Sequence, residues 1–316
     1  MFYSNQAAVG RIYRVVLVVS LLVTAATLKA IGLQQVADEG FDAKVARPAY
    51  TAKHPKVLID EAHNNFHTAT GRYKIFATLI ANDGYAVAQG KEKFDAQALK
   101  GCDILVISNA LGAAQLGDPG SDNPAFTEAE CDVVRDWVKS GGSLLLIADH
   151  APIGGANEIL GKRFGIEMSK LHTLDTAHAD LKDGGNEGWL IFSRANGLLG
   201  DHPITRGRND AEKVNSVTTF MGQSLKGPGE GAPFLKLADT AGDVDVKTQK
   251  EVSAAGRAQG IALAFGKGKI VVLGEAAMMT AQLGGPNKLK FGMNREGNDN
   301  KQLALNIMHW LSGLLK

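Results

Sequence analysis

Short apolar runs divide the chain after residue 55 into a series of predicted strands. Continuous apolar stretches lie at residues 56–60, 103–107 and 144–147, and a shorter one begins at Tyr85. Runs of this length without polar alternation are typical of strands that are buried on both faces of a parallel sheet.

Segments with helical spacing separate these runs. Tyr73, Phe76 and Ile80 recur at intervals of three and four residues, which predicts a helix that stops before Gly84. The pair Thr127 and Glu130 has the spacing of a capping box and predicts the start of a second helix. Strands that alternate with helices in this way predict a doubly wound, mostly parallel α/β sheet.

The regular pattern breaks between about residues 172 and 256. Short mixed segments there predict an irregular insertion with antiparallel strands and long loops. Apolar runs return at residues 261–265 and 270–273, separated by Gly266-Lys267-Gly268, and predict a terminal hairpin. A last helix is expected to close the domain.

The N-terminus has the pattern of an export segment. Arg11 and Arg14 precede an apolar run at residues 15–28, which is followed by Lys29. Residues 1–36 are therefore interpreted as a signal peptide or as an N-terminal membrane anchor, with cleavage and retention both open. We expect residues 37–55 to be a linker and residues 56–316 to form one exported domain, either periplasmic or held on the inner membrane and facing outward.

The charge balance and the cysteine count narrow the possible partners. The chain has 34 Lys+Arg against 33 Asp+Glu and a formal net charge of +1, so nucleic acid is not an expected partner. The two cysteines, Cys102 and Cys131, lie in apolar surroundings and imply no disulfide framework.

Polar side chains follow several predicted strands at the point where each strand ends. Ligands of open parallel sheets bind outside the carboxyl ends of the strands, so these residues are candidates for a site. The candidates are His63, His67, Asp149, His150 and Glu275. Together they are suitable ligands for a divalent metal ion, and a polar cluster that is joined by hydrogen bonds without metal is the alternative.

Four short segments, at residues 63–68, 149–152, 274–278 and 292–294, carry a resemblance to a known family. They resemble the class I glutamine amidotransferase-like superfamily, and within it a bacterial exported or membrane-associated group related to the domain of gliding-motility and intraflagellar-transport proteins. The resemblance implies a flavodoxin-like, amidotransferase-like α/β domain. True amidotransferases carry a nucleophilic cysteine on the turn after a central strand, where this sequence has Asp149-His150, so glutaminase activity is not expected.

Two classes of function remain open, with a third suggested by the resemblance. A hydrolase would use a metal-activated water, or would use His63, His150 and Glu275 as catalytic residues without metal. A non-catalytic module would bind a sugar or another small polar ligand in the same place. The third class is a scaffold domain in an envelope complex.

Overall fold

The computed structural model describes residues 35–229 and 231–316, so the predicted export segment lies almost entirely outside the described residues. Within these ranges no helix is long and apolar enough to cross a membrane. The main sheet has nine strands, of which eight follow the order β3-β2-β4-β5-β15-β14-β10-β6, while β11 pairs with β14. This mixed α/β sheet confirms the predicted fold class, and its parallel part comprises β2, β3, β4, β5 and β15.

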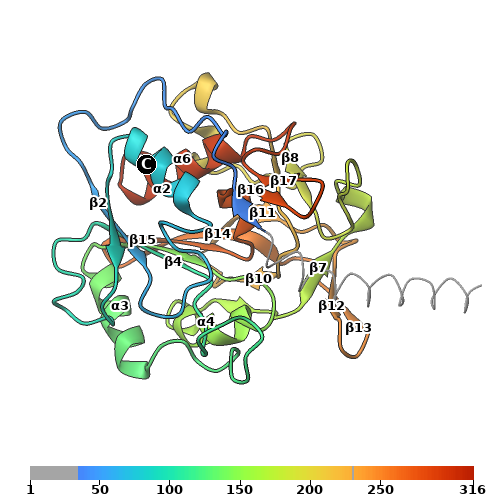
Figure 1. Ribbon diagram of the computed structural model, residues 1–316, viewed down its shortest axis with the longest axis horizontal. Helices are drawn as coiled ribbons and strands as arrows, with labels where there is room; N and C mark the ends of the chain where they lie inside the picture. Colours follow the sequence, from blue (N-terminus) through green and yellow to red (C-terminus); the bar gives the residue numbers. More distant parts are fainter. Residues whose placement is uncertain (1–34, 230) are drawn as a thin grey trace, which may run out of the picture.

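The strands of the main sheet are β2 (Lys56–Asp60), β3 (Ala86–Gly90), β4 (Ile104–Ser108), β5 (Ser143–Ile147), β6 (Glu167–Met168), β10 (Leu225–Lys226), β11 (Ala232–Lys236), β14 (Ala258–Phe265) and β15 (Gly268–Leu273). The longer helices are α2 (Lys74–Asn82), α3 (Glu128–Lys139), α4 (Ile153–Lys162) and α6 (Asn300–Leu311). In Figure 1, α2 and α6 lie above the sheet, and α3 and α4 lie below it.

Alternate residues of the central strands enter two separate cores. Leu145 and Ile147 of β5 pack with α2 and α6, whereas Leu144 and Leu146 pack with α3 and α4. All five residues of β5 are buried, as the uninterrupted apolar run requires for a strand that is covered on both faces.

The region predicted as an irregular insertion contains short strands and single turns. Its elements are β7 (His172–Leu174), β8 (Ile191–Ser193), β9 (Ser216–Thr218), β12 (Gly242–Asp245), β13 (Lys250–Ser253), α5 (Pro203–Arg206), η1 (Thr176–His178) and η2 (Asp210–Glu212). Strands β13, β12 and β7 form a separate antiparallel sheet, whereas β10 and β11 join the main sheet. The predicted hairpin is β14 with β15.

Another antiparallel sheet involves the start of the described chain. It contains β1 (Val36–Ala37), β16 (Ala281–Gly284) and β17 (Leu289–Gly292). The single turn η3 (Ala277–Met279) comes directly before β16. Residues 37–55, expected to be a linker, begin in β1 and then pack along the surface of the domain. One contact there is a hydrogen bond of 3.1 Å from the backbone N–H of Tyr50 to the carbonyl oxygen of Asp83.

We expect Thr127→Ala to lower the free energy of unfolding by about 1 kcal/mol. The Thr127 side chain accepts the Glu130 N–H while the Glu130 carboxylate accepts the Thr127 N–H, so the predicted capping box is present. Urea denaturation measures the change. Thr78→Ala, at an exposed position within α2, is the control and should change stability by less than about 0.5 kcal/mol. Equal effects of the two substitutions would contradict the role of the cap.

Candidate functional site

The carboxyl ends of three neighbouring parallel strands bring three loops together. Strand β5 lies between β4 and β15, with Ile147 paired to Ser108 on one side and to Leu273 on the other. The segments that follow, 109–112, 148–152 and 274–279, therefore leave the sheet side by side. This is the edge at which open α/β sheets place their ligands.

Asp149 joins all three loops. One carboxylate oxygen accepts the Asn109 side-chain N–H at 2.7 Å, and the other accepts the backbone N–H of Ala276 at 2.7 Å. The Asn109 side-chain oxygen in turn accepts the backbone N–H of Asp149 at 3.1 Å. Asn109 has φ of 51°, a left-handed conformation that Asn tolerates better than most residues. We call this arrangement the Asp149 clamp.

Glu275 is buried beside the clamp and holds its own loop. Its two carboxylate oxygens accept the backbone N–H groups of Ala277 and Met278. Burial, together with the charge of Asp149, raises the pKa of Glu275 to about 8, although backbone hydrogen bonds oppose the shift. Burial also raises the pKa of Asp149 against the opposing effects of His150 and Asn109. The negative charge of Asp149 therefore disfavours ionisation of Glu275.

The segment that leads into α2 places two ring side chains, His67 and Tyr73, at this edge of the sheet. Tyr73 is fully buried and its hydroxyl donates to the Ala276 carbonyl at 3.1 Å, while the Ser108 hydroxyl lies beside it. The His67 ring lies 4.9 Å from the Tyr73 ring, centroid to centroid, and its Nδ1 is buried without a hydrogen-bond partner. Burial is the main cause that lowers the pKa of His67 to about 3, and the positive charge of Arg72 lowers it further.

His63 belongs to a different cluster. Its Nδ1 lies 2.9 Å from the Asp60 carboxylate and its Nε2 lies 3.0 Å from Glu130, so both ring nitrogens already contact carboxylates. The ring is fully buried between Phe94 and Phe126. This arrangement ties the end of β2 to the first turn of α3 and leaves neither nitrogen for a metal or a substrate.

His150 follows the clamp but is directed toward the insertion. Its Nδ1 lies 2.9 Å from the carbonyl oxygen of Ala151, and its ring stacks on His172 of β7 with centroids 3.7 Å apart. Burial and the neighbouring His150 lower the pKa of His172 to about 3. The stacked pair joins the start of α4 to the small sheet of the insertion.

The five predicted ligands are therefore distributed over distinct places. The structure brings Asp149 and Glu275 together, with His67 and Tyr73 nearby, but His63 and His150 have separate partners. Among residues 35–229 and 231–316, no three His, Cys, Asp or Glu side chains are arranged to hold a metal ion.

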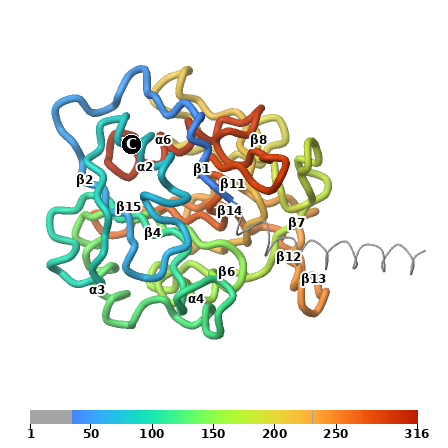
Figure 2. Tube along the Cα trace, in the orientation of Figure 1, coloured from blue at the N-terminus to red at the C-terminus, as the bar shows by residue number. Residues whose placement is uncertain are grey.

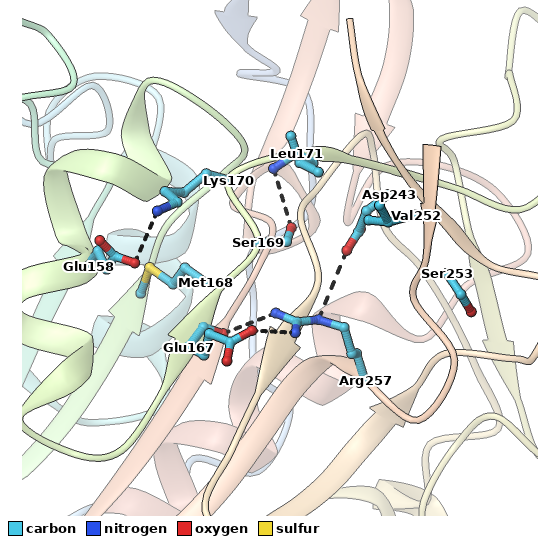
Figure 3. Close-up of a pocket in the computed structure, with 10 residues that line it drawn as sticks. All are labelled: Glu158, Glu167, Met168, Ser169, Lys170, Leu171, Asp243, Val252, Ser253 and Arg257. Atoms are coloured by element: carbon cyan, nitrogen blue, oxygen red, sulfur yellow. Dashed lines mark hydrogen bonds and ion pairs between the residues drawn. The ribbon is translucent and has the colours of Figure 1, made fainter. Parts of the chain in front are cut away.

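A cavity of about 360 Å³ lies on the antiparallel side of the same edge (Figure 3). In the hairpin register Gly260 pairs with Leu273, so Arg257 at the start of β14 extends past the carboxyl end of β15. We call this space the Arg257 cavity. Its lining residues are Glu158, Glu167, Met168, Ser169, Lys170, Leu171, Asp243, Val252, Ser253 and Arg257.

Gln223 connects the clamp to this cavity. Its side-chain N–H groups donate to the carbonyl oxygens of Ala148 and Asp149, at 2.9 and 3.0 Å. Its side-chain oxygen accepts the backbone N–H of Lys170 at 2.7 Å. A buried amide thus fixes the cavity wall relative to the end of β5.

A buried carboxylate orients the polar groups of the cavity. Asp243 accepts the hydroxyl groups of Thr173 and Ser224, each at 2.6 Å. Arg257 Nε donates to the Ser224 oxygen at 2.6 Å, and its Nη1 contacts Glu167 at 2.6 Å. The Arg257 guanidinium is therefore held from two sides. Figure 3 draws its contacts with Glu167 and with Asp243 as dashed lines.

The second cation of the cavity is also paired. Lys170 Nζ lies 3.1 Å from Glu158, on the side of the cavity away from Arg257. Each cation thus contacts a carboxylate of the same cavity, and Met168, Leu171 and Val252 supply apolar parts of the lining. Sequence reasoning missed these residues, because only the folding of the insertion brings 167–171, 243 and 252–257 together.

The strand order defines a mixed α/β protein with a large, mostly parallel central sheet. Among solved structures, the chain is similar to the mmIFT52 N-terminal domain, with a TM-score of 0.55 and 16% identity over 81% of this chain and 97% of that one. It is also similar to a GMP synthase-like protein from Thermoplasma acidophilum, with a TM-score of 0.42 and 12% identity over 84% and 96% of the two chains.

A ThuA-like protein from Parabacteroides merdae is a further structural neighbour, with a TM-score of 0.42 and 14% identity over 82% of this chain and 90% of that one. No protein-family model matches the sequence, and no curated protein matches it. At these identities the likenesses concern the fold alone.

The buried neutral His67 should make the protein sensitive to acid. Its folded pKa of about 3 lies below the ordinary 6.5, so its contribution to stability is complete above pH 6.5 and is lost as the pH falls toward 3. Between pH 7 and 5 this loss is about 2 kcal/mol. We expect His67→Gln to remove that part of the pH dependence in urea titrations.

His54→Gln is the control for this pH series, because His54 is exposed and lies outside the site. The control should keep the wild-type difference in stability between pH 7 and 5. If His67→Gln keeps the same difference as well, the imidazole is not held neutral by burial.

Proposed function

We propose that this protein is an exported, non-catalytic module that binds a small polar ligand of the sugar class in the Arg257 cavity. One observation carries the non-catalytic part. Glu275, the predicted catalytic carboxylate, and Asp149 near it accept backbone N–H groups from residues 276–278. They stabilise the loops of the edge, and acid or base chemistry there would require those hydrogen bonds to break.

The surroundings of the histidines favour the same interpretation. A general base needs a free nitrogen within reach of the substrate, whereas His63 contacts carboxylates through both nitrogens. His150 stacks on His172, away from the His63 cluster. A shared site for His63, His150 and Glu275 therefore has no support in their contacts.

The cysteines offer no alternative nucleophile. Burial raises the pKa of Cys102 to about 11 and that of Cys131 to about 12, so both thiols stay protonated at neutral pH. The turn after β5 carries Asp149 in place of a cysteine. These features argue against glutaminase chemistry.

The pairing of charges in the cavity favours a neutral, polyhydroxyl ligand. A simple anion would have to displace Glu167 from Arg257 or Glu158 from Lys170. A hydroxyl group both donates and accepts, so a sugar can bond to the edges of these ion pairs without separating them. The apolar side chains of the lining suit the C–H face of a sugar ring, and the volume falls within the range of small-molecule sites.

The export part of the proposal comes from residues 1–36. Cell fractionation of the full chain tests it: recovery in the periplasm or the inner membrane supports export, and recovery in the cytosol contradicts it.

Val252→Trp should block the cavity. Val252 lines it from β13 with 55% of its surface exposed, so a large side chain at this position projects into the space. We expect one or more members of a panel of neutral aldohexoses and N-acetylhexosamines to raise the melting temperature of the wild type. The variant should weaken that binding at least about tenfold in calorimetry.

Val246→Trp is the matched control, because Val246 lies in the same hairpin, is 41% exposed and does not line the cavity. Binding by the control should equal that of the wild type. The sugar proposal fails if no panel member binds the wild type, or if Val252→Trp binds normally. Binding of glucuronate or phosphate alone would also contradict it, since those probes require a free cation.

A further inference from the structure

Strand β3 leaves one edge of the main sheet open. It is the outermost strand at one end of the strand order, and in the described part of the chain it pairs with β2 alone. The backbone N–H of Ala86 donates to the carbonyl oxygen of Pro55, next to β2, at 3.0 Å. Successive residues of a strand direct their backbone groups to opposite sides, so Val87 and Gln89 direct theirs away from β2.

This edge lacks the features that usually protect an edge strand. Residues 86–90 read Ala-Val-Ala-Gln-Gly, without charge or proline, and their register with β2 has no bulge. The backbone N–H and C=O groups of Val87 and Gln89 have no hydrogen-bond partner within residues 35–229 and 231–316. Unpaired backbone groups of this kind are a template for another strand.

A groove of about 260 Å³ lies beside the open edge, on one face of the sheet. The parallel register pairs Lys56 with Ala86 and Leu58 with Ala88, so these four side chains lie on the same face. Leu58 is half-buried against the core on the α3 and α4 side, whereas Ala86 and Ala88 are exposed. All four residues line the groove, which therefore reaches the edge strand itself. We call it the β3 groove.

Two lysines without an ion pair lie at one end of the β3 groove. Lys56 and Lys100 line it, and the pairing of Lys56 with Ala86 places this end at the start of β3. A Cβ atom built on Gly101 would lie 3.8 Å from the Lys56 Nζ, so this ammonium group is directed toward the turn beside Lys100. Neither lysine contacts a carboxylate through its Nζ in the part of the chain that the structure describes. The Asp103 carboxylate accepts the Lys56 backbone N–H and offsets part of the positive charge.

We propose that β3 binds an extended segment of another protein by strand addition. The segment runs antiparallel to β3 and forms its hydrogen bonds with the outward backbone groups of Val87 and Gln89. It carries an apolar side chain over the β3 groove and, two residues further along, an acidic side chain that reaches Lys56 and Lys100.

The positions of the lysines give the direction of the segment. A residue opposite Ala88 directs its side chain to the groove face, where the small alanines leave space for an apolar group. In the antiparallel direction, the residue two positions further along lies opposite Ala86, at the end of the groove that carries Lys56 and Lys100. The opposite charges then favour a carboxylate at that residue.

A second copy of this chain is a less suitable occupant. In a symmetric antiparallel pair of β3 strands, the exposed residues Lys91, Glu92 and Lys93 of one copy would approach Lys56 and Lys100 of the other. Mainly positive charges would meet at each end, and their repulsion opposes the pairing.

The β3 groove is separate from the Arg257 cavity. Strands β3 and β6 lie at opposite ends of the strand order, and β6 lines the cavity. Figure 2 shows β2 on the side of the molecule away from β12 and β13, which also line the cavity. This inference is therefore independent of the proposed sugar site.

The test uses the full chain and a fluorescein-labelled peptide that alternates threonine with valine. Glutamate replaces the last valine, and the carboxyl terminus is an amide. One matched peptide has glutamine in place of glutamate. Another has proline at a central threonine, which removes a backbone donor. Fluorescence anisotropy measures the binding of each peptide.

Gln89→Pro should weaken binding of the glutamate peptide at least about tenfold, because it removes an outward N–H and keeps the pairing with β2. Gln89→Ala keeps the N–H and is the control, with binding close to that of the wild type. Lys100→Glu should weaken binding of the glutamate peptide about threefold and leave the glutamine peptide unchanged. Lys213→Glu, exposed and outside the groove lining, is the control for charge.

The proline peptide repeats the test from the side of the ligand, so the result does not depend on the folding of Gln89→Pro. Failure of the glutamate peptide to bind the wild type would overturn the proposal, as would equal binding of the proline peptide. Equal binding of the glutamate and glutamine peptides would exclude the acidic side chain. A dimer in sedimentation that Gln89→Pro dissociates would identify a second copy as the occupant instead.

Discussion

The Asp149 carboxylate is the interaction on which the arrangement of the sheet edge depends. It lies after the central strand β5 and accepts one N–H from the loop after β4 and another from the loop after β15. Parallel strands align their carboxyl ends, but nothing in the ladder itself fixes the loops that follow. A single half-buried carboxylate supplies that constraint here.

The clamp divides the edge into a closed part and an open part. In the closed part, Glu275 and Tyr73 lie near Asp149, and the His67 ring packs on Tyr73. The antiparallel strands β14, β10 and β6 extend the edge to the other side, where the insertion sheet forms the Arg257 cavity. Gln223 couples the two parts, so the cavity wall depends on the clamp for its position.

Local patterns predicted the framework of the fold because local physics determines it. The runs at 56–60, 103–107 and 144–147 became buried parallel strands, and Thr127 with Glu130 formed the capping box. The site depended on long-range pairings that have no local signal. His63 contacts Asp60, 3 residues away in the sequence, and Glu130, 67 residues away. Asp243 accepts a hydrogen bond from Thr173, which is 70 residues away. The predicted strand ends placed Asp149 and Glu275 at one edge of the sheet, but they could not indicate that both carboxylates accept hydrogen bonds from the loops there.

A double-mutant cycle on Asn109 and Asp149 tests the central claim most directly. Asn109→Gly removes the side chain and tolerates the left-handed backbone, and Asp149→Ala removes the carboxylate. If the clamp is structural, each change should cost about 1–3 kcal/mol in free energy of unfolding, because buried donors lose their acceptor. The double variant should then cost less than the sum by more than about 0.5 kcal/mol. Single variants as stable as the wild type or more so, as expected for a strained catalytic pair, would contradict the account.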